Sequence, residues 1–277
     1  MLWGGNAVVS KASAGIIVAS DIAFYRWAMA TVLLAPLAGA QLGRRRSTIL
    51  AEVPRAVVLG LLGSALFPWL MYLAAATTSA TNIGLFQALL PVFAIVFARA
   101  LLGTPITPVM VAGAAISLVG VAVVVVGADP AGASMALLNR GDMLMLAATA
   151  CFALYSVLLG LWKTSLPLTA DLFGQSLAAT IFLLPLFWST PSQPFALPSL
   201  WLVGYAALCA SIVAPMLWMR GIAGIGPARA AMLFNLLPLV TAGLAIAFLE
   251  EQLTPGLVPG GTITIIGVAV VQRARKP

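Results

Sequence analysis

Few side chains in this sequence are suited to binding a solute, and they are amides, a cation and aromatic rings rather than acids or imidazoles. The 277 residues include no His and only seven Asp and Glu. General acid–base catalysis most often uses His, which is also the commonest metal ligand, so neither a metal site nor a cofactor is predicted. Non-covalent recognition remains, and its candidate residues are Asn6, Lys11, Tyr72, Gln87, Tyr155, Trp218 and Asn235.

The elements that carry these residues are membrane helices. Hydrophobic residues make up 62% of the chain, charged residues 8%, and the mean hydropathy is +1.10, whereas a soluble domain has about 25% charged residues. The apolar runs are long and do not alternate, which favours helices of about 20 residues over barrel strands. Cys151 and Cys209 lie singly inside such runs and predict no disulfide. The chain is therefore expected to be an all-α integral membrane protein.

Ten membrane-spanning helices are predicted from the apolar runs and their Gly, Pro and charge breaks. The first is short, as though the chain began partway through a helix, and we expect a leader to be missing. The predicted spans are residues 1–14, 21–42, 53–75, 79–101, 105–126, 142–162, 170–189, 200–220, 227–249 and 254–271.

Lys and Arg are distributed unevenly about these spans. With the N-terminus inside, eleven of the fourteen basic residues fall on the inner side, among them the run from Arg44 to Arg46. Such an excess marks the cytoplasmic side, so both termini are predicted to be cytoplasmic. The net charge of +7 then reflects topology and anionic inner-leaflet lipid, and no nucleic-acid partner is expected.

The second half of the sequence repeats the first. "LLPVFAIVFARALLGTPITPVMVAGAAISLVGVAVVV" matches "LLPLVTAGLAIAFLEEQLTPGLVPGGTITIIGVAVV" without a gap, at a constant offset of 147 residues that also relates Pro68 to Pro215. A gapless match of this length indicates a duplicated unit, which we place at residues 1–127 and 140–274. Each unit has five spans, so the second must enter the membrane inverted. Inverted repeats are typical of secondary transporters, whose site lies near the midplane between the halves.

Two prolines at equivalent positions are predicted hinges. Pro91 and Pro238 lie inside the fourth and ninth predicted spans, where each removes the hydrogen bond to the carbonyl four residues earlier. Such carbonyls are tolerated at membrane depth only against protein, water or ligand. Gln87 and Asn235 lie beside them, which favours a cavity lining over a simple kink.

Each candidate also has a plainer interpretation. Lys11 either faces a cavity or extends its ammonium to the interface, and the two are equally expected. Asn6 by itself is slightly more typical of a helix–helix hydrogen bond, and Trp218 of an interfacial ring. Arg26 is expected to pair with Asp21, in a structural role.

The motifs "WGGNAVVSK" and "YRWAMATVLLAPL", with the repeated "LLPVF…GVAVV" segments, resemble the drug/metabolite transporter superfamily in its ten-helix EamA-type branch. The resemblance covers essentially the whole chain. It implies ten helices around a central cavity lined by helices one, three, four, six, eight and nine. It also implies a bacterial plasma-membrane protein that moves amino acids, other metabolites or drugs, mostly outward.

The sequence departs from this family in its acids. Gly103 and Thr104 stand where the first repeat often has a Glu, and Glu250 and Glu251 are expected to end helix nine rather than to couple protons. Helix one has no carboxylate, which argues against proton-coupled export of cationic drugs.

The predicted function is therefore passage of small amphipathic metabolites, amino acids first, by alternating access. Uniport and proton antiport both remain open, and a monomer is possible. The alternatives are a multidrug exporter and, from another class, a membrane-embedded enzyme acting on lipid. The enzyme would need acid–base or metal-binding residues that this chain lacks.

Overall fold

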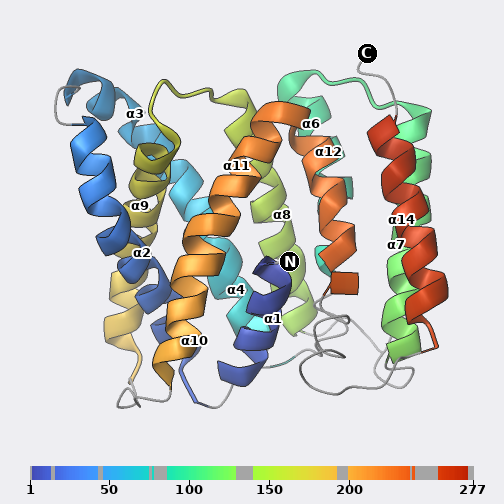
Figure 1. The fold of residues 1–277 in the computed structure, drawn as a ribbon, viewed down its shortest axis with the longest axis horizontal. Helices are drawn as coiled ribbons and strands as arrows, with labels where there is room; N and C mark the ends of the chain where they lie inside the picture. Colours follow the sequence, from blue (N-terminus) through green and yellow to red (C-terminus); the bar gives the residue numbers. More distant parts are fainter. Residues whose placement is uncertain are drawn as a thin grey trace.

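The computed structural model describes residues 2–13, 16–42, 46–74, 77, 86–128, 140–191, 199–237, 239–240 and 255–273, and these form a bundle of helices (Figure 1). The helices of the first half are α1 (Leu2–Ser13), α2 (Ala19–Leu42), α3 (Arg46–Leu59), η1 (Gly60–Leu66), α4 (Phe67–Ala74), α6 (Leu90–Leu102) and α7 (Pro108–Ala128). Those of the second are α8 (Arg140–Leu161), α9 (Leu168–Ser189), α10 (Leu200–Tyr205), η3 (Ala206–Val213), α11 (Ala214–Ile225), α12 (Pro227–Met232), η4 (Leu233–Leu236) and α14 (Leu257–Arg273).

Every predicted span contains described helix, so the all-α membrane fold is confirmed. Five of the described helical stretches are long and apolar enough to cross a membrane, namely Ala19–Gln41, Leu50–Ala74, Arg140–Leu161, Leu168–Ser189 and Leu200–Ile225. Large apolar side chains such as Val32, Ile181 and Val258 are exposed on the outside of the bundle, where lipid would cover them. Residues 241–254, with Glu250 and Glu251, lie outside the described residues.

Local sequence explains where several helices stop and start. Gly103 ends α6 in the left-handed region at φ 66°, a conformation that costs glycine no steric clash. Gly226, at φ 82°, separates α11 from α12, and Pro227 then occupies the first turn of α12, where its missing N–H costs nothing. The predicted eighth and ninth spans are thereby separated.

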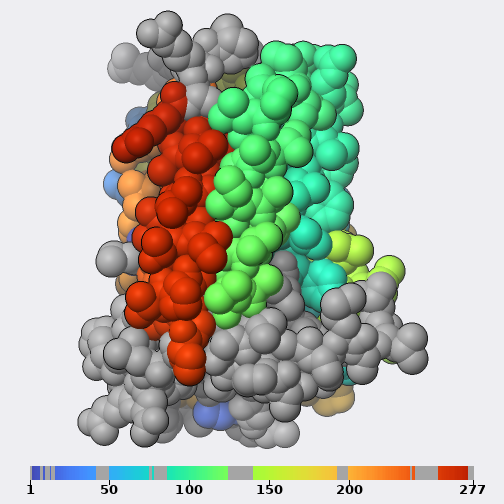
Figure 2. Space-filling model, turned by 90° about the vertical axis from the view of Figure 1, so that its right-hand side faces the viewer, coloured from blue at the N-terminus to red at the C-terminus, as the bar shows by residue number. Residues whose placement is uncertain are grey.

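Helices α7 and α14 pack against each other in opposite directions along one face of the bundle (Figure 2). Their contact depends on glycine, because a Cβ on Gly113 would lie 2.9 Å from the Gly267 carbonyl oxygen and one on Gly120 would lie 2.7 Å from that of Gly260. Gly113 and Gly120 are the repeat equivalents of Gly260 and Gly267. The two contacts therefore exchange when the repeats are exchanged, as a twofold axis between inverted halves requires.

Helices α2 and α9 are a second pair at equivalent repeat positions, and they also pack against each other in opposite directions. Thr169, near the start of α9, donates to Gln41 at the end of α2 over 2.8 Å. Toward the other end, Phe24 stacks on Phe187 with ring centroids 4.6 Å apart. These contacts make the two helices antiparallel along their whole length.

Both halves contain a π-helical segment at the same repeat position. η1 and η3 each continue directly into an α-helix that begins near a proline, Pro68 in α4 and Pro215 in α11. A π-helix is rare and frequently marks a functional site. The apolar runs alone did not predict these segments.

Candidate functional site

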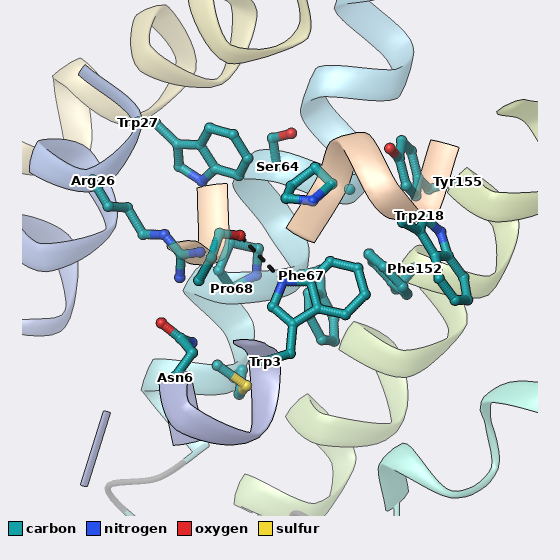
Figure 3. Close-up of a pocket in the computed structure, with 14 residues that line it drawn as sticks. Trp3, Asn6, Arg26, Trp27, Ser64, Phe67, Pro68, Phe152, Tyr155 and Trp218 are labelled. Atoms are coloured by element: carbon teal, nitrogen blue, oxygen red, sulfur yellow. Dashed lines mark hydrogen bonds between the residues drawn. The ribbon is translucent and has the colours of Figure 1, made fainter. Parts of the chain in front are cut away.

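A small pocket lies between the two halves, lined by α1, α2, η1, α4, α8, η3 and α11 (Figure 3). Three equivalent pairs are found among its residues: Gly63 with Ala210, Pro68 with Pro215, and Met71 with Trp218. The pocket is therefore built around the repeat axis. This is where an inverted-repeat transporter holds its substrate.

Aromatic rings form one side of the pocket. Phe152 is their centre, with ring centroids 5.7 Å from Trp3, 4.6 Å from Phe67, 5.4 Å from Tyr155 and 5.6 Å from Trp218. These distances are those of favourable edge and offset contacts. The Trp218 indole N–H donates to Ser156 Oγ over 3.2 Å, which fixes the ring and leaves its apolar faces for packing.

Arg26 of α2 lies on the opposite side of the pocket, as Figure 3 shows. It is only 4% exposed and sits seven residues into its helix, roughly 10 Å from the helix start. Its Nε donates to Ser211 Oγ over 2.8 Å, and Nη1 donates to the Tyr72 hydroxyl over 3.2 Å. Both acceptors are neutral, so these bonds orient the guanidinium without cancelling its charge.

The expected ion pair of Arg26 with Asp21 is wrong. Among the described residues Arg26 has hydroxyl partners, while Asp21 accepts from Ser20 over 3.3 Å. The reason is helical geometry, since residues five apart point about 140° away from each other and only those three or four apart are neighbours.

Trp27 adds a second donor to the pocket wall. Its side chain is 3% exposed, and its indole N–H has no hydrogen-bond partner among the described residues. The Arg26 guanidinium carbon lies 5.6 Å from the centroid of the Trp27 ring, within cation–π range. A buried N–H without an acceptor costs about 1–3 kcal/mol, so this side of the pocket is suited to an acceptor from a bound solute.

The two pocket prolines leave backbone acceptors in the same wall. In each π-helix the residue before the proline bonds five positions back, Phe67 to Leu62 and Ala214 to Cys209. Pro68 and Pro215 have no N–H to continue this pattern. The carbonyls five residues earlier, those of Gly63 and Ala210, therefore receive no backbone hydrogen bond from the prolines. Trp3 Nε1 donates to the Ala210 carbonyl over 3.1 Å.

The pocket is narrow in this conformation. The space in which a water-sized sphere can be centred is about 40 Å³, and each water needs about 10–15 Å³ by that measure. It has room for a few waters. Binding of a metabolite therefore requires the walls to separate.

Of the predicted site residues, Asn6, Tyr155 and Trp218 line the pocket. Tyr72 is buried and is not among the lining residues, but its hydroxyl accepts a hydrogen bond from the lining residue Arg26. Lys11 belongs to α1, but its side chain lies outside the described residues.

The remaining predicted residues lie elsewhere. Gln87 is half-buried, and its amide contacts Met71 Sδ at 3.4 Å. Asn235 is fully buried in η4 and donates to Ser117 Oγ over 2.9 Å. Neither lines the pocket, so in this conformation the structure does not bring them to it.

The predicted hinges differ from expectation in one respect. Pro91 lies in the first turn of α6, after a turn at Ala88 and Leu89, rather than inside a continuous helix. The chain is broken at that point, but at a helix start, where proline is well tolerated. Pro238 lies outside the described residues.

Among the described residues, the helices that line the pocket differ in part from the expected set. Spans one, three, six and eight contribute as expected, but the described parts of spans four and nine do not, and span two contributes Arg26 and Trp27 instead. Phe234 of η4 packs behind the aromatic side, 5.1 Å from Trp218 by ring centroids. The signals that sequence reasoning missed were an arginine inside a span with no acid three or four residues away, and the repeated prolines Pro68 and Pro215.

Comparison with known proteins agrees with this architecture. The EamA-like transporter family matches residues 1–126 and 139–273, which together make up nearly all of the chain. The chain belongs to this family. It is therefore a membrane transporter rather than an enzyme.

Two relatives of this EamA-like transporter match over most of their length. One, from Bacillus subtilis, is named "Uncharacterized transporter YyaM" and is 25% identical over 269 residues, covering 96% of this chain and 88% of the relative. The other, from Streptantibioticus cattleyicolor, is named "Probable terminal-alkyne amino-acid exporter" and is 26% identical over 264 residues, covering 92% and 84%.

A solved crystal structure shares the fold. It superposes with a TM-score of 0.80 over 98% of this chain and 92% of its own chain, at 20% sequence identity. At that identity the likeness shows the fold alone.

Proposed function

We propose that this EamA-like transporter moves small amphipathic metabolites, amino acids first, across the bacterial plasma membrane by alternating access. The observation that carries the proposal is the pocket between the two halves, which has the Arg26 cation on one side and aromatic rings around Phe152 on the other. Such a division suits a solute with one charged end and one apolar end. The name of the Streptantibioticus relative, an amino-acid exporter, is in keeping with it.

The movement we propose is a rocking of two five-helix repeats, residues 1–127 and 140–274, about the pocket. Opening first toward one membrane face and then toward the other would widen the narrow pocket that lies between the two repeats. We further propose that both termini are cytoplasmic. Arg99 and Arg273 lie in the last turns of α6 and α14, and Figure 1 shows the end of α14 on the side of the bundle where the C-terminus is marked.

Counterflow of radiolabelled amino acids in proteoliposomes tests this function. Preloaded unlabelled L-phenylalanine should drive uptake of labelled L-phenylalanine, and empty liposomes should not show it. Absence of counterflow across a panel of neutral and apolar amino acids would reject the substrate class.

A multidrug exporter of cationic compounds is the second candidate, because aromatic rings such as Trp3 and Trp218 are able to bind a quaternary ammonium. Arg26 opposes it by charge, and the described lining residues include no carboxylate. Preference for quaternary ammonium compounds over amino acids in a binding assay would favour this candidate.

The coupling of transport is tested separately. Uphill substrate accumulation driven by an imposed pH gradient would identify proton antiport instead of uniport.

A further inference from the structure

Arg26 is a charged group inside the membrane whose charge the described protein does not neutralise. Arg55 forms ion pairs with Glu52 and Asp171, whereas the hydrogen bonds of Arg26 among the described residues go to the hydroxyls of Ser211 and Tyr72. A charged side chain at membrane depth is costly and normally faces a partner or an aqueous cavity. Arg26 lines the pocket, so the partner is expected from there.

The N–H groups of Arg26 and Trp27 that have no acceptor among the described residues are suited to binding an anion. A guanidinium has five N–H groups, and Ser211 and Tyr72 accept from Nε and Nη1 only. The adjacent Trp27 N–H, also buried, has no acceptor in the described structure. Arginine forms its strongest contacts with planar carboxylates through two parallel N–H bonds.

The two bonds that hold Arg26 also join the halves of the transporter. Tyr72 belongs to α4 of the first half, and Ser211 belongs to η3 of the second. Ser211 in turn donates to the Ala206 carbonyl, five residues back in the π-helix, over 2.8 Å. The guanidinium is therefore positioned by both halves, and its position depends on how they sit together.

We propose that Arg26 is the specificity-determining residue for a carboxylate on the transported solute, with Trp27 as a second donor. The carboxylate binds at Arg26, and the apolar part of the solute lies toward the rings around Phe152. This deepens the proposed function by naming the chemical group that the pocket selects, and it rests on that function. It also gives Arg26 a cationic role for which Lys11 was a candidate in the sequence, where a cavity and an interfacial position of Lys11 were equally expected.

Matched acid and amide ligands test the proposal. Binding of 3-phenylpropionate and 3-phenylpropionamide to the purified full-length protein is measured in nanodiscs of neutral phosphatidylcholine, where no anionic headgroup competes. The wild type should bind the acid at least about tenfold more tightly than the amide, the factor expected for a charged hydrogen bond. Arg26→Gln should bring the ratio close to one, and Arg26→Lys should give an intermediate ratio.

Two further variants separate recognition from folding. Arg99→Gln removes an arginine at the exposed end of α6, where it donates to Gly103, and should leave the ratio unchanged. Tyr72→Phe keeps the cation but removes one of its two supports, so the ratio should fall severalfold even if Arg26→Gln does not fold. A purely structural Arg26 would lower thermal stability in these variants with no change in the acid-to-amide ratio.

The possible results distinguish the two proposals. Acid-selective binding without counterflow of any neutral or apolar amino acid in the panel would reject amino acids as the transported class and keep Arg26 as the carboxylate-selective residue of the pocket. Equal counterflow of L-phenylalanine and L-phenylalaninamide would keep transport and overturn the role of Arg26. Loss of 3-phenylpropionate binding when phosphatidylglycerol replaces the neutral lipid would also overturn it, because the site would then belong to a lipid headgroup.

Discussion

Arg55 of α3 and Asp171 of α9 form a two-point ion pair, with Nη1 2.6 Å from Oδ1 and Nη2 3.2 Å from Oδ2. Both side chains are largely buried, at 10% and 2% exposed. Arg55 Nε also donates to the Trp162 carbonyl, just beyond α8, over 2.7 Å. One arginine of the first half therefore joins α9 to the residue that follows α8 in the second half.

Replacing Asp171 with Asn should lower the free energy of unfolding by about 3 kcal/mol or more, because it leaves a buried guanidinium without its counter-ion. Thermal unfolding of the detergent-solubilised protein measures the change. Glu52→Gln is the matched control, since Glu52 is 16% exposed and its 3.6 Å approach to the same guanidinium is too long for a hydrogen bond, so its loss should cost less than that of Asp171. Equal losses in the two variants would contradict this ranking.

The glycine contact between α7 and α14 predicts a second stability effect. Gly267→Ala puts a methyl group 2.7 Å from the Gly113 carbonyl oxygen, so the helices must separate and the protein should lose about 1–3 kcal/mol. Gly39→Ala in α2 has no neighbour within 4 Å and should be neutral or slightly stabilising. Unchanged unfolding of Gly267→Ala would show that the two helices are not in close contact in the membrane.

These contacts show what the sequence can and cannot predict. Apolar runs and a constant offset located the helices and the equivalence of Gly113 with Gly260, because both depend on local pattern and on duplication. The partner of Arg26 could not be predicted in the same way. Ser211 is 185 residues distant, and only the packing of η3 against α2 brings it there. Local charge spacing favoured Asp21, which faces another side of the helix.

The proline positions predict different effects on turnover. Pro68→Ala supplies an N–H that can reach the Gly63 carbonyl, so it should stiffen the junction of η1 and α4 and slow transport several-fold, with a smaller change in KM. Pro91→Ala is the control, because Pro91 lies in the first turn of α6, where an added N–H gains no helical acceptor. Counterflow rates at several substrate concentrations separate the two parameters. A larger effect of Pro91→Ala would restore Pro91 as the principal hinge.

Gln87 and Asn235 remain candidates whose role a paired experiment can decide. If they bind substrate when the pocket opens, Gln87→Leu and Asn235→Leu should impair uptake with little loss of folded protein. If they are packing amides, each hydrogen bond contributes about 0.6 kcal/mol and uptake stays near normal. Asn235→Leu should cost more stability than Gln87→Leu, because Asn235 is fully buried against Ser117. Transport and thermal unfolding are measured in parallel, and unchanged uptake in both variants would remove them from the site.

Gly63 sets the width of the pocket on the side of Tyr155. A Cβ at this position would lie 2.6 Å from ring atoms of Tyr155, so Gly63→Ala must push the ring into a space that is already narrow. Overpacking of this kind costs about 1–3 kcal/mol, or about fivefold to 150-fold in binding. The loss of binding should be greatest for solutes whose apolar part packs against the aromatic rings of the pocket. We expect L-phenylalanine counterflow to fall at least about fivefold, while a small amino acid such as alanine is affected less. Gly204→Ala in α10 has no neighbour within 4 Å and should leave both rates unchanged. An equal decrease for large and small substrates would mean that Gly63 supports the fold rather than the shape of the pocket.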